Sequence, residues 1–388
     1  MKSICFVSNK YPNDMDPNGL VFVQQLVWTM ADIGIQCSVI CPLAVNLYPS
    51  LVKVPYYVEE TTEKGNKVEV YFPKYFGLGQ SHYIFGKSPA PLTTALFTKA
   101  VKKVISSYKL LPDAIYGHFI TPAGIAAARI GRELNIPAFL AHGESTQWSI
   151  DQFGAHNVAK ELENIDGVIA VSTRNKDLLI AKKCVTKDKI KVFPNGYRSE
   201  RFYQMDKMRA RKKMGFPQED FIVGFVGSFD DRKGVLRLQE AVGMVKGVKY
   251  ACAGKGKLMP GGPDCLLAKP VENALLPFFY SAIDVFALPT LNEGCCNAII
   301  EALACGCPVI SSNLSFNDDI LDENCSVRID PGNVNDLASA IEALHADPDK
   351  LMQMGKAALE KASKLTLDTR AENILDFMEN MSCKRSSL

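Results

Sequence analysis

Two glutamates, Glu293 and Glu301, flank the start of a predicted helix and are the residues with the clearest chemical potential in this sequence. Segment 289–294 reads as a loop after an apolar strand at 284–288, and segment 298–305 has helical composition. Helical side chains tilt toward the helix N-terminus, so Glu301 is expected to reach back to the mouth that Glu293 enters from the loop. A helix start also offers free N–H groups and a positive dipole end, which suit a phosphate. The pattern predicts a nucleotide-sugar site, although two glutamates at this spacing also occur on solvated surface helices.

The elements that must position these groups alternate between strands and helices in two successive halves. The first half has short apolar strands at 3–8, 36–41, 67–72, 113–117, 138–142, 167–172 and 189–193. The second half has them at 221–226, 248–253, 264–268 and 285–288. Short buried strands that alternate with helices form parallel sheets covered on both faces. We therefore predict an α/β protein with two doubly wound, Rossmann-like domains, a linker near 195–215, and a cleft between the domains.

Length and composition limit the class of protein. A chain of 388 residues is too long for one core to keep growing, which favours two domains. The net charge of +2 predicts no nucleic-acid partner, and no segment approaches the roughly 20 apolar residues of a membrane span. The 12 cysteines form no C-x2-C pair, so we expect reduced, mostly buried thiols rather than a zinc site or a disulfide framework.

The segment from Glu293 to Pro308 resembles the E-x7-E signature of family four of the retaining glycosyltransferases (glycosyl transferases group 1), which have the GT-B fold. The turn Pro194-Asn-Gly196 also resembles a turn of this family, with Arg198 where the family usually has Asp. The likeness covers nearly the whole chain and is strongest over 221–332. It is closest to members of bacterial capsule, exopolysaccharide and teichuronic acid biosynthesis.

The resemblance implies that the chain has three parts with different roles. Residues 1–196 would form an acceptor-binding domain and residues 197–365 a donor-binding domain for the nucleotide sugar. Residues 366–388 would form a terminal helix that packs back on the first domain. These bounds are expectations that follow from the family likeness.

The resemblance also implies roles in the second domain. Glu301 is expected to bind the ribose hydroxyls, and Glu293 to contact the donor sugar. Lys233 matches a family cation that neutralises the diphosphate, whose charge grows as the sugar leaves. Ser228 stands where the family commonly has Arg, and Arg232 is a candidate replacement; the alternative reading is a solvated basic turn. The remaining predicted donor contacts are Gly19, Cys296, Asn297 and Ala298.

In the first domain, His118 directly follows the predicted strand 113–117 and matches a family histidine that contacts the transferred sugar. A lone histidine is more often structural, but this position favours a role in the site. With Glu293 and Lys233 it completes the predicted catalytic set. His142 and Glu144 are further predicted contacts to the acceptor or the sugar. Asp14-Met-Asp16 has the form of a D-x-D metal motif and is interpreted here as a turn.

The expected reaction is transfer of a sugar from a nucleoside-diphosphate sugar, UDP rather than GDP, to a hydroxyl of a glycan or lipid-linked acceptor. Retention by front-face attack is expected, with protein cations in place of a metal and no cofactor. Three alternatives are a nucleotide-sugar epimerase of the same fold, a non-catalytic nucleotide-sugar-binding protein, and a nicotinamide oxidoreductase. The last would need a G-x-G-x-x-G fingerprint, which the sequence lacks.

Three basic segments bear on location. Residues 99–109, 182–191 and 207–213 are rich in lysine and arginine, which indicates either solvated helix faces or peripheral contact with an anionic membrane. We expect a cytoplasmic protein, with the inner face of the cell membrane as an option. The sequence leaves open the donor base and sugar, the acceptor and the oligomeric state.

Overall fold

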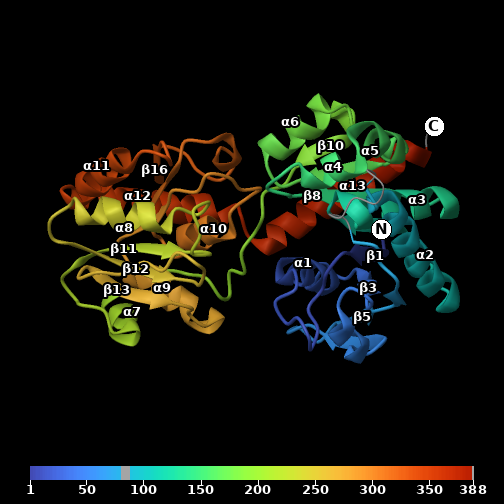
Figure 1. Ribbon diagram of the computed structural model, residues 1–388, viewed down its shortest axis with the longest axis horizontal. Helices are drawn as coiled ribbons and strands as arrows, with labels where there is room; N and C mark the ends of the chain where they lie inside the picture. Colours follow the sequence, from blue (N-terminus) through green and yellow to red (C-terminus); the bar gives the residue numbers. More distant parts are fainter. Residues whose placement is uncertain (80–87, 387–388) are drawn as a thin grey trace. The chain divides into compact units, whose positions relative to one another are not determined.

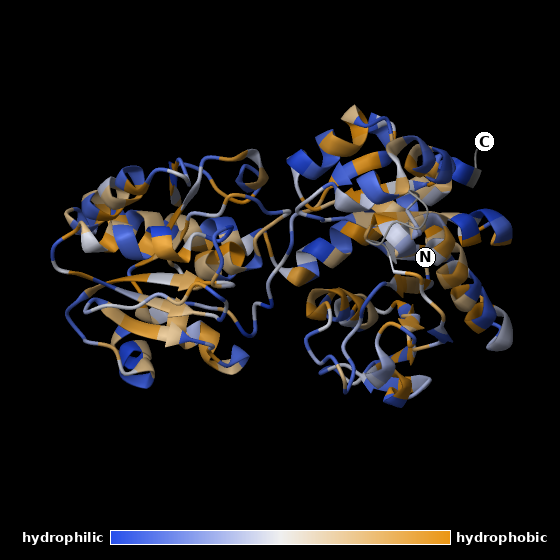
Figure 2. Cartoon of the chain, in the orientation of Figure 1, coloured by the Kyte–Doolittle hydropathy of each residue, from blue (hydrophilic) through white to orange (hydrophobic). Residues whose placement is uncertain are grey.

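The computed structural model describes residues 1–79 and 88–386, and the chain divides into two compact units. The first unit comprises Met1–Phe193 together with Arg370–Leu388, and the second comprises Pro194–Thr369. In Figure 1 each unit is a sheet with helices packed against it. Figure 2 shows hydrophobic residues concentrated in the strands, as expected for sheets that are buried on both faces.

The first unit is built on one eight-stranded sheet with the strand order β10-β9-β8-β7-β1-β2-β5-β4. Its strands are β1 (Ser3–Ser8), β2 (Gln36–Ile40), β4 (Tyr57–Thr61), β5 (Lys67–Tyr71), β7 (Ala114–His118), β8 (Ala138–His142), β9 (Gly167–Ala170) and β10 (Ile190–Val192). A separate pair joins β3 (Leu43–Ala44) to β6 (Lys74–Tyr75). The helices are α1 (Val21–Asp32), α2 (Ala90–Ser107), α3 (Ile125–Leu134), α4 (Trp148–Phe153), α5 (Ala155–Leu162), α6 (Thr173–Ala181) and the C-terminal α13 (Leu367–Ser386).

Two apolar cores cover the two faces of this sheet. Helices α2, α3 and α5 contribute to one core, and α1 and α13 contribute to the other. The terminal helix places Ile374 and Phe377 in the second core, where the Phe377 ring lies 5.5 Å from that of Phe193 and 6.5 Å from that of Phe139. Its far end is held by an ion pair between Arg385 and Asp166 at 2.8 Å.

The second unit is built on a six-stranded parallel sheet with the order β13-β12-β11-β14-β15-β16. Its strands are β11 (Phe221–Val226), β12 (Val248–Ala253), β13 (Cys265–Lys269), β14 (Val285–Leu288), β15 (Val309–Ser312) and β16 (Ser326–Ile329). Its helices are α7 (Lys207–Met214), α8 (Val235–Gly243), α9 (Leu276–Ala282), α10 (Asn297–Ala304), α11 (Val334–His345) and α12 (Pro348–Ser363). One continuous apolar core spans this unit.

Some elements differ from the sequence prediction. Strand β4 is antiparallel to β5 at the sheet edge, and its alternating exposure explains why it was not recognised as a buried strand. Helix α7 lies inside the stretch 198–218, which was predicted to belong largely to a linker. Arg211 on this helix is buried and donates to Asp284 at 2.7 Å, so packing rather than an apolar periodicity fixes the helix. Strand β16 and helix α4 were also not predicted.

All 12 cysteines are free, and nine of them are buried. Within the described part of the chain, no helix has both the length and the apolar character needed to cross a bilayer.

Candidate functional site

In each unit the chain order reverses between two neighbouring strands. In parallel sheets, ligands bind outside the carboxyl ends of the strands at such a switch point. In the second unit the reversal lies between β11 and β14, which pair in parallel with Gly224 opposite Phe286. The loops that leave these two strands are 227–234 and 289–296. The predicted donor residues Ser228, Arg232, Lys233 and Glu293 all lie on these two loops.

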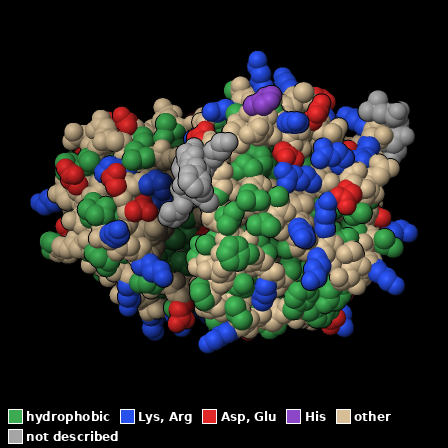
Figure 3. Space-filling model, turned by 45° about the vertical axis from the view of Figure 1, so that its right-hand side comes forward, with side chains coloured by type: hydrophobic (Ala, Val, Ile, Leu, Met, Phe, Trp, Pro, Cys, Tyr) green, Lys and Arg blue, Asp and Glu red, His purple; other side chains and the backbone are tan. Residues whose placement is uncertain are grey.

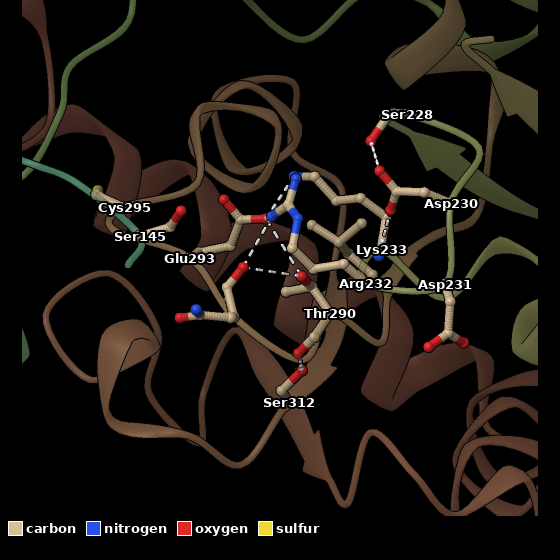
Figure 4. A network of polar contacts seen from close by, with 12 residues as sticks. Ser145, Ser228, Asp230, Asp231, Arg232, Lys233, Thr290, Glu293, Cys295 and Ser312 are labelled. Carbon is tan, nitrogen blue, oxygen red and sulfur yellow. Dashed lines mark hydrogen bonds and ion pairs between the residues drawn. The ribbon is translucent and has the colours of Figure 1, made fainter. Parts of the chain in front are cut away.

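Glu293 is the centre of a charge cluster at this switch point (Figure 4). Its Oε1 accepts from Nζ of Lys233 at 2.7 Å and from Nη1 of Arg232 at 2.5 Å. The hydroxyl of Thr290, which is buried, donates to the same oxygen at 3.2 Å. Burial opposes the charge of Lys233, but the nearby Cys296 and Glu293 groups outweigh it and raise the lysine pKa. Lys233 is therefore a cation at neutral pH.

The basic loop is shaped by its own hydrogen bonds. Asp230 accepts from the Ser228 hydroxyl at 2.6 Å and from the Lys233 amide at 2.9 Å. Burial raises the pKa of Asp230, but these bonds and the two neighbouring cations lower it overall, so it is ionised. Ser228 thus helps to fold the loop, and its hydroxyl is engaged with Asp230.

Two glycines allow a second loop to pack closely under the first. A Cβ on Gly254 would lie 1.9 Å from the carbonyl oxygen of Gly227, and one on Gly256 would lie 2.2 Å from that of Phe229. This close approach permits backbone bonds such as Phe229 N–H to the Lys255 carbonyl at 2.9 Å. The segment 254–256 therefore supports the basic loop from below and fixes its position.

Helix α10 begins directly after the Glu293 loop. Its N-cap residue is Cys296, and within the described residues no side-chain hydrogen bond caps the helix. The Cys296 sulfur faces the first-turn amides without the geometry of a capping bond. A helix of this kind keeps its first N–H groups available to an anion. Cys296, Asn297 and Ala298, all predicted donor contacts, line this helix tip.

Glu301 lies one helical turn further along α10 and contacts α9. Its Oε2 accepts from the Tyr280 hydroxyl of α9 at 2.9 Å. Part of the residue stays exposed, but the carboxylate is enclosed by protein, and this burial raises the pKa of Glu301 to about 7 despite opposing effects of Tyr280 and Arg201. The contacts of Glu293 described above run to the basic loop and those of Glu301 to α9, so the two acids occupy separate surroundings.

The first unit has its own switch point, between β1 and β7. Ser8 and His118 are register partners at the carboxyl ends of these strands, and His118 is the last residue of β7 rather than the residue after it. Asn9 joins the two loops beyond: it donates to the Thr121 carbonyl at 2.8 Å and accepts from the Ala123 amide at 3.1 Å.

His118 is enclosed by aromatic rings, with the Phe119 centroid at 4.7 Å and the Phe22 centroid at 5.4 Å. Burial, helped by the positive charge of Arg370, lowers the pKa of His118 to about 3, so the imidazole is neutral. Its Nδ1 is buried without a hydrogen-bond partner among the described residues. Phe119 has a φ of 71°, a conformation that costs a non-glycine residue roughly 1–3 kcal/mol and is concentrated at functional sites.

His142 is fully buried at the end of β8 and both of its ring nitrogens are engaged. Asn175 donates to Nε2 at 3.2 Å, so the ring proton is on Nδ1, which donates to Glu144 at 2.8 Å. Asn175 is itself held by the Ser172 hydroxyl at 2.6 Å. His142 therefore positions Glu144, and Glu144 is the member of this pair that retains exposed surface.

Gly19, predicted to lie against the donor phosphate or the acceptor, closes a turn before α1. Its amide donates to the Asp16 carbonyl at 3.1 Å, and a Cβ would lie 2.9 Å from a carboxylate oxygen of the same aspartate. The Asp14–Asp16 segment is part of this turn. Across residues 1–79 and 88–386, the structure contains no group of three or more His, Cys, Asp or Glu side chains suited to a metal ion.

Two family models match the chain. The model described as Glycosyltransferase Family 4 matches residues 21–201, and the model described as Glycosyl transferases group 1 matches residues 220–347. The second match contains the switch point of the second unit, and the first match contains β7 with His118 but begins after β1. The chain belongs to this glycosyltransferase family.

Several relatives agree with the assignment. The glycosyltransferase is 27% identical over 352 residues to TuaC of Bacillus subtilis (strain 168), a protein whose name assigns it provisionally to teichuronic acid biosynthesis; the match covers 87% of this chain and 88% of TuaC. Sucrose-phosphate synthase from Thermosynechococcus elongatus superposes with a TM-score of 0.76 at 20% identity, over 98% of this chain and 99% of the other. HepE of Anabaena, solved with UDP, gives 0.72 at 16% identity over 98% and 100%. The predicted GT-B fold and family are confirmed.

Within each unit, the structure of the glycosyltransferase brings most predicted site residues to a strand end. It also adds Asn9 and Asn175, which the sequence analysis did not single out, and a long-range partner for Asn195, which the sequence analysis placed in a turn. Asn195 donates to Asn297 Oδ1 at 2.8 Å and so ties the Pro194–Gly196 turn to the tip of α10. An Asn-Gly pair signals only a turn, so its long-range partner could not be read from the sequence.

Proposed function

We propose that this glycosyltransferase moves a sugar from a nucleoside-diphosphate sugar to a hydroxyl group of a glycan or lipid-linked acceptor, in bacterial surface polysaccharide synthesis. The observation that carries the proposal is the cluster of Lys233, Arg232 and Glu293 beside the open tip of α10. Two cations and a row of amide donors suit a diphosphate, which is the charge-dense part of such a donor. UDP is the favoured nucleotide, which agrees with the UDP bound to HepE.

In the proposed reaction the protein itself forms no covalent bond with the sugar. The acceptor oxygen forms a bond to the anomeric carbon, the bond from that carbon to the diphosphate oxygen breaks, and the acceptor proton leaves with the diphosphate. Lys233 and Arg232 stabilise the negative charge that grows on the leaving diphosphate. Glu293 orients both cations and contacts the donor sugar, while Glu301 accepts hydrogen bonds from the ribose hydroxyls.

Retention of configuration fits a front-face attack. A double displacement needs a carboxylate free to act as a nucleophile, with its partner carboxyl about 5 Å away. The Glu293 oxygen is engaged by three donors, so we assign it a binding role rather than a nucleophilic one. We further propose that the two cations replace a divalent metal, and that no cofactor is needed.

The first unit would supply hydrogen-bonding contacts to the sugar and the acceptor. His118, kept uncharged by burial, can exchange hydrogen bonds with sugar hydroxyls without repelling or attracting a charge. Glu144, held by His142, is placed to accept from an acceptor hydroxyl.

A donor panel tests the proposal. Thermal shifts with UDP-, GDP- and ADP-sugars should show stabilisation by one nucleotide class, because a ligand stabilises only the state that binds it. Transfer to a saccharide or lipid-linked acceptor should then proceed in EDTA, and NMR of the product should show the anomeric configuration of the donor.

The alternatives give different results. Conversion of the donor to an epimer without acceptor would contradict transfer and support an epimerase. Stabilisation without transfer or hydrolysis for any acceptor class would indicate a binding protein. Loss of activity in EDTA, restored by Mg²⁺ or Mn²⁺, would contradict metal independence.

A further inference from the structure

The carboxylate of Glu301 has one oxygen in a hydrogen bond and one oxygen open to a ligand. Acidic and basic side chains are spread over the visible surface of the protein (Figure 3), because burying an unpaired charge is costly. The Glu301 carboxylate is instead enclosed by protein, although part of the residue stays exposed. Its Oε2 accepts from the Tyr280 hydroxyl at 2.9 Å, and within residues 1–79 and 88–386 no group donates to its Oε1.

The Tyr280 ring is fixed by aromatic packing in the core of the second unit. The residue is fully buried on α9, and its ring centroid lies 5.7 Å from that of Phe286, 6.0 Å from that of Phe279 and 6.1 Å from that of Phe202. Since interiors are close-packed, the ring cannot swing away without repacking its neighbours. The core therefore sets the position of the hydroxyl that holds Glu301.

The direction of the hydrogen bond follows from the protonation of both groups. Burial, followed by the charge of Glu301, raises the pKa of Tyr280 well above its usual value of 10, so the hydroxyl keeps its proton and donates. Burial raises the pKa of Glu301 to about 7, and the Tyr280 bond and the Arg201 charge act in the opposite direction. The neighbouring Cys305 thiol is neutral, because burial raises its pKa to about 12. Tyr280 thus favours the ionised form of the acid.

The bond is not needed to join the two helices. Helices α9 and α10 already share an apolar core, to which α9 contributes Phe279 and α10 contributes Ile300 and Leu303. Burying a carboxylate costs free energy that an apolar side chain at the same place would not. This cost is expected where the acid has a function besides holding the helices together.

We propose that Tyr280 is a positioning residue for nucleotide recognition: it orients the carboxylate of Glu301 toward the vicinal hydroxyls of a ribose and so makes the site select ribonucleoside over 2′-deoxyribonucleoside diphosphates. The inference rests on the proposed function, in which Glu301 accepts from the ribose. Each carboxylate oxygen has about two lone-pair positions, so Oε2 can serve Tyr280 and one hydroxyl while Oε1 serves the other. A site built to bond a hydroxyl rejects the analogue that lacks it, because its buried acceptor is left unpaired.

Calorimetric titration with pairs of nucleotides tests this inference. The pairs are UDP with dUDP, GDP with dGDP and ADP with dADP, which differ only in the 2′-hydroxyl. The wild type should prefer the ribonucleotide of the pair that it binds by roughly 10–100-fold, the range for a hydrogen bond to a charged group. Tyr280→Phe should reduce this preference about tenfold, mainly by weakening ribonucleotide binding. Glu301→Ala should abolish it, and adding Tyr280→Phe to that variant should change nothing further.

Tyr250→Phe is the matched control. Tyr250 is also buried in the second unit, and its hydroxyl donates to the Gly261 carbonyl at 2.6 Å, so the change again removes one buried hydroxyl. This variant should keep the wild-type preference. NMR titration of the Glu301 carboxyl carbon gives a readout without nucleotide: the midpoint should lie near 7 in the wild type and the control, and higher in Tyr280→Phe.

The outcomes separate this inference from the proposed function. Equal losses of ribo- and deoxyribonucleotide affinity in Tyr280→Phe would show that Tyr280 only supports the fold of the unit. An unchanged preference or an unchanged midpoint in that variant would also overturn the inference, while the proposed donor class would stand. If the wild type bound no nucleoside diphosphate, the proposed function and the inference would both be contradicted.

Discussion

The two switch points of this protein are built from opposite kinds of chemistry. In the second unit, Glu293, Lys233 and Arg232 are in direct contact and all carry charge. In the first unit, His118 sits among aromatic rings and its charged form is suppressed. Both sites occupy equivalent positions in a doubly wound sheet, so the fold does not explain the difference. The side chains do.

The difference indicates what each unit recognises. A diphosphate is charge-dense and needs cations whose charge is secure at neutral pH, as the environment of Lys233 provides. A sugar hydroxyl is neutral and needs hydrogen-bonding groups that do not attract counter-ions, as the buried His118 provides. The predictions below test this division, beginning with the largest expected effect.

Lys233→Ala should lower kcat by about 10²–10³-fold, because it removes a cation from the leaving diphosphate. UDP affinity should fall as well, while the melting temperature without ligand changes little. Lys257→Ala is the matched control, since that lysine is exposed on a neighbouring loop. If Lys233→Ala and Lys257→Ala had the same rates and the same UDP affinity, the proposed role of the Lys233 cation in binding the diphosphate would be contradicted.

The two sites should respond to pH in opposite directions. Glu301 has its pKa raised from 4.5 to about 7, so the folded state binds its proton more tightly. The stability linked to this group is complete below about pH 4.5 and is lost as pH rises to 7, a change on the order of 3 kcal/mol. His118 has its pKa lowered from 6.5 to about 3, so its contribution is present above pH 6.5 and lost as pH falls.

Urea unfolding from pH 5 to pH 8 measures both effects. Compared with the wild type, Glu301→Gln should gain stability at pH 8 relative to pH 5, and His118→Gln should gain it at pH 5 relative to pH 8. Parallel pH profiles for the wild type and both variants would show that neither site holds its group in an unusual protonation state.

Gly254→Ala should destabilise the second unit by about 1–3 kcal/mol, the usual cost of overpacking. The added methyl group would meet the Gly227 carbonyl at 1.9 Å and push the basic loop away. UDP affinity should fall with stability, since Lys233 moves with that loop. Gly243→Ala is the control: nothing lies within 4 Å of the position that its added Cβ would take, so it should be neutral or stabilising. Differential scanning calorimetry with and without UDP separates the two outcomes.

The sequence was sufficient for the fold and for the strand ends, because buried strands and helix starts leave local signals. It placed Glu293 and Lys233 on two loops, and the structure joins them in one ion pair. It failed where a partner lies far along the chain. The Tyr280 hydroxyl, 21 residues away in the sequence, donates to the carboxylate of Glu301. No local pattern encodes that hydrogen bond.

The smallest expected effect concerns the first unit. Asn175→Ala removes the donor to His142 Nε2 and the donor to the Glu144 backbone carbonyl at 3.0 Å, so the imidazole and Glu144 lose their fixed orientation. We expect the acceptor KM to rise about fivefold, in line with the loss of one hydrogen bond of about 1 kcal/mol, with UDP affinity unchanged. The ¹⁵N shift of His142 Nε2 should change, because this nitrogen loses its hydrogen-bond donor. Asn157→Ala is the control, because Asn157 of α5 donates to the backbone carbonyl of Phe153 at the end of α4, at 3.0 Å, and not to His142 or Glu144. If Asn175→Ala changed the donor and acceptor kinetics equally, Asn175, His142 and Glu144 would be a structural support of the whole unit. The proposal that the first unit acts as a separate acceptor site would then be contradicted.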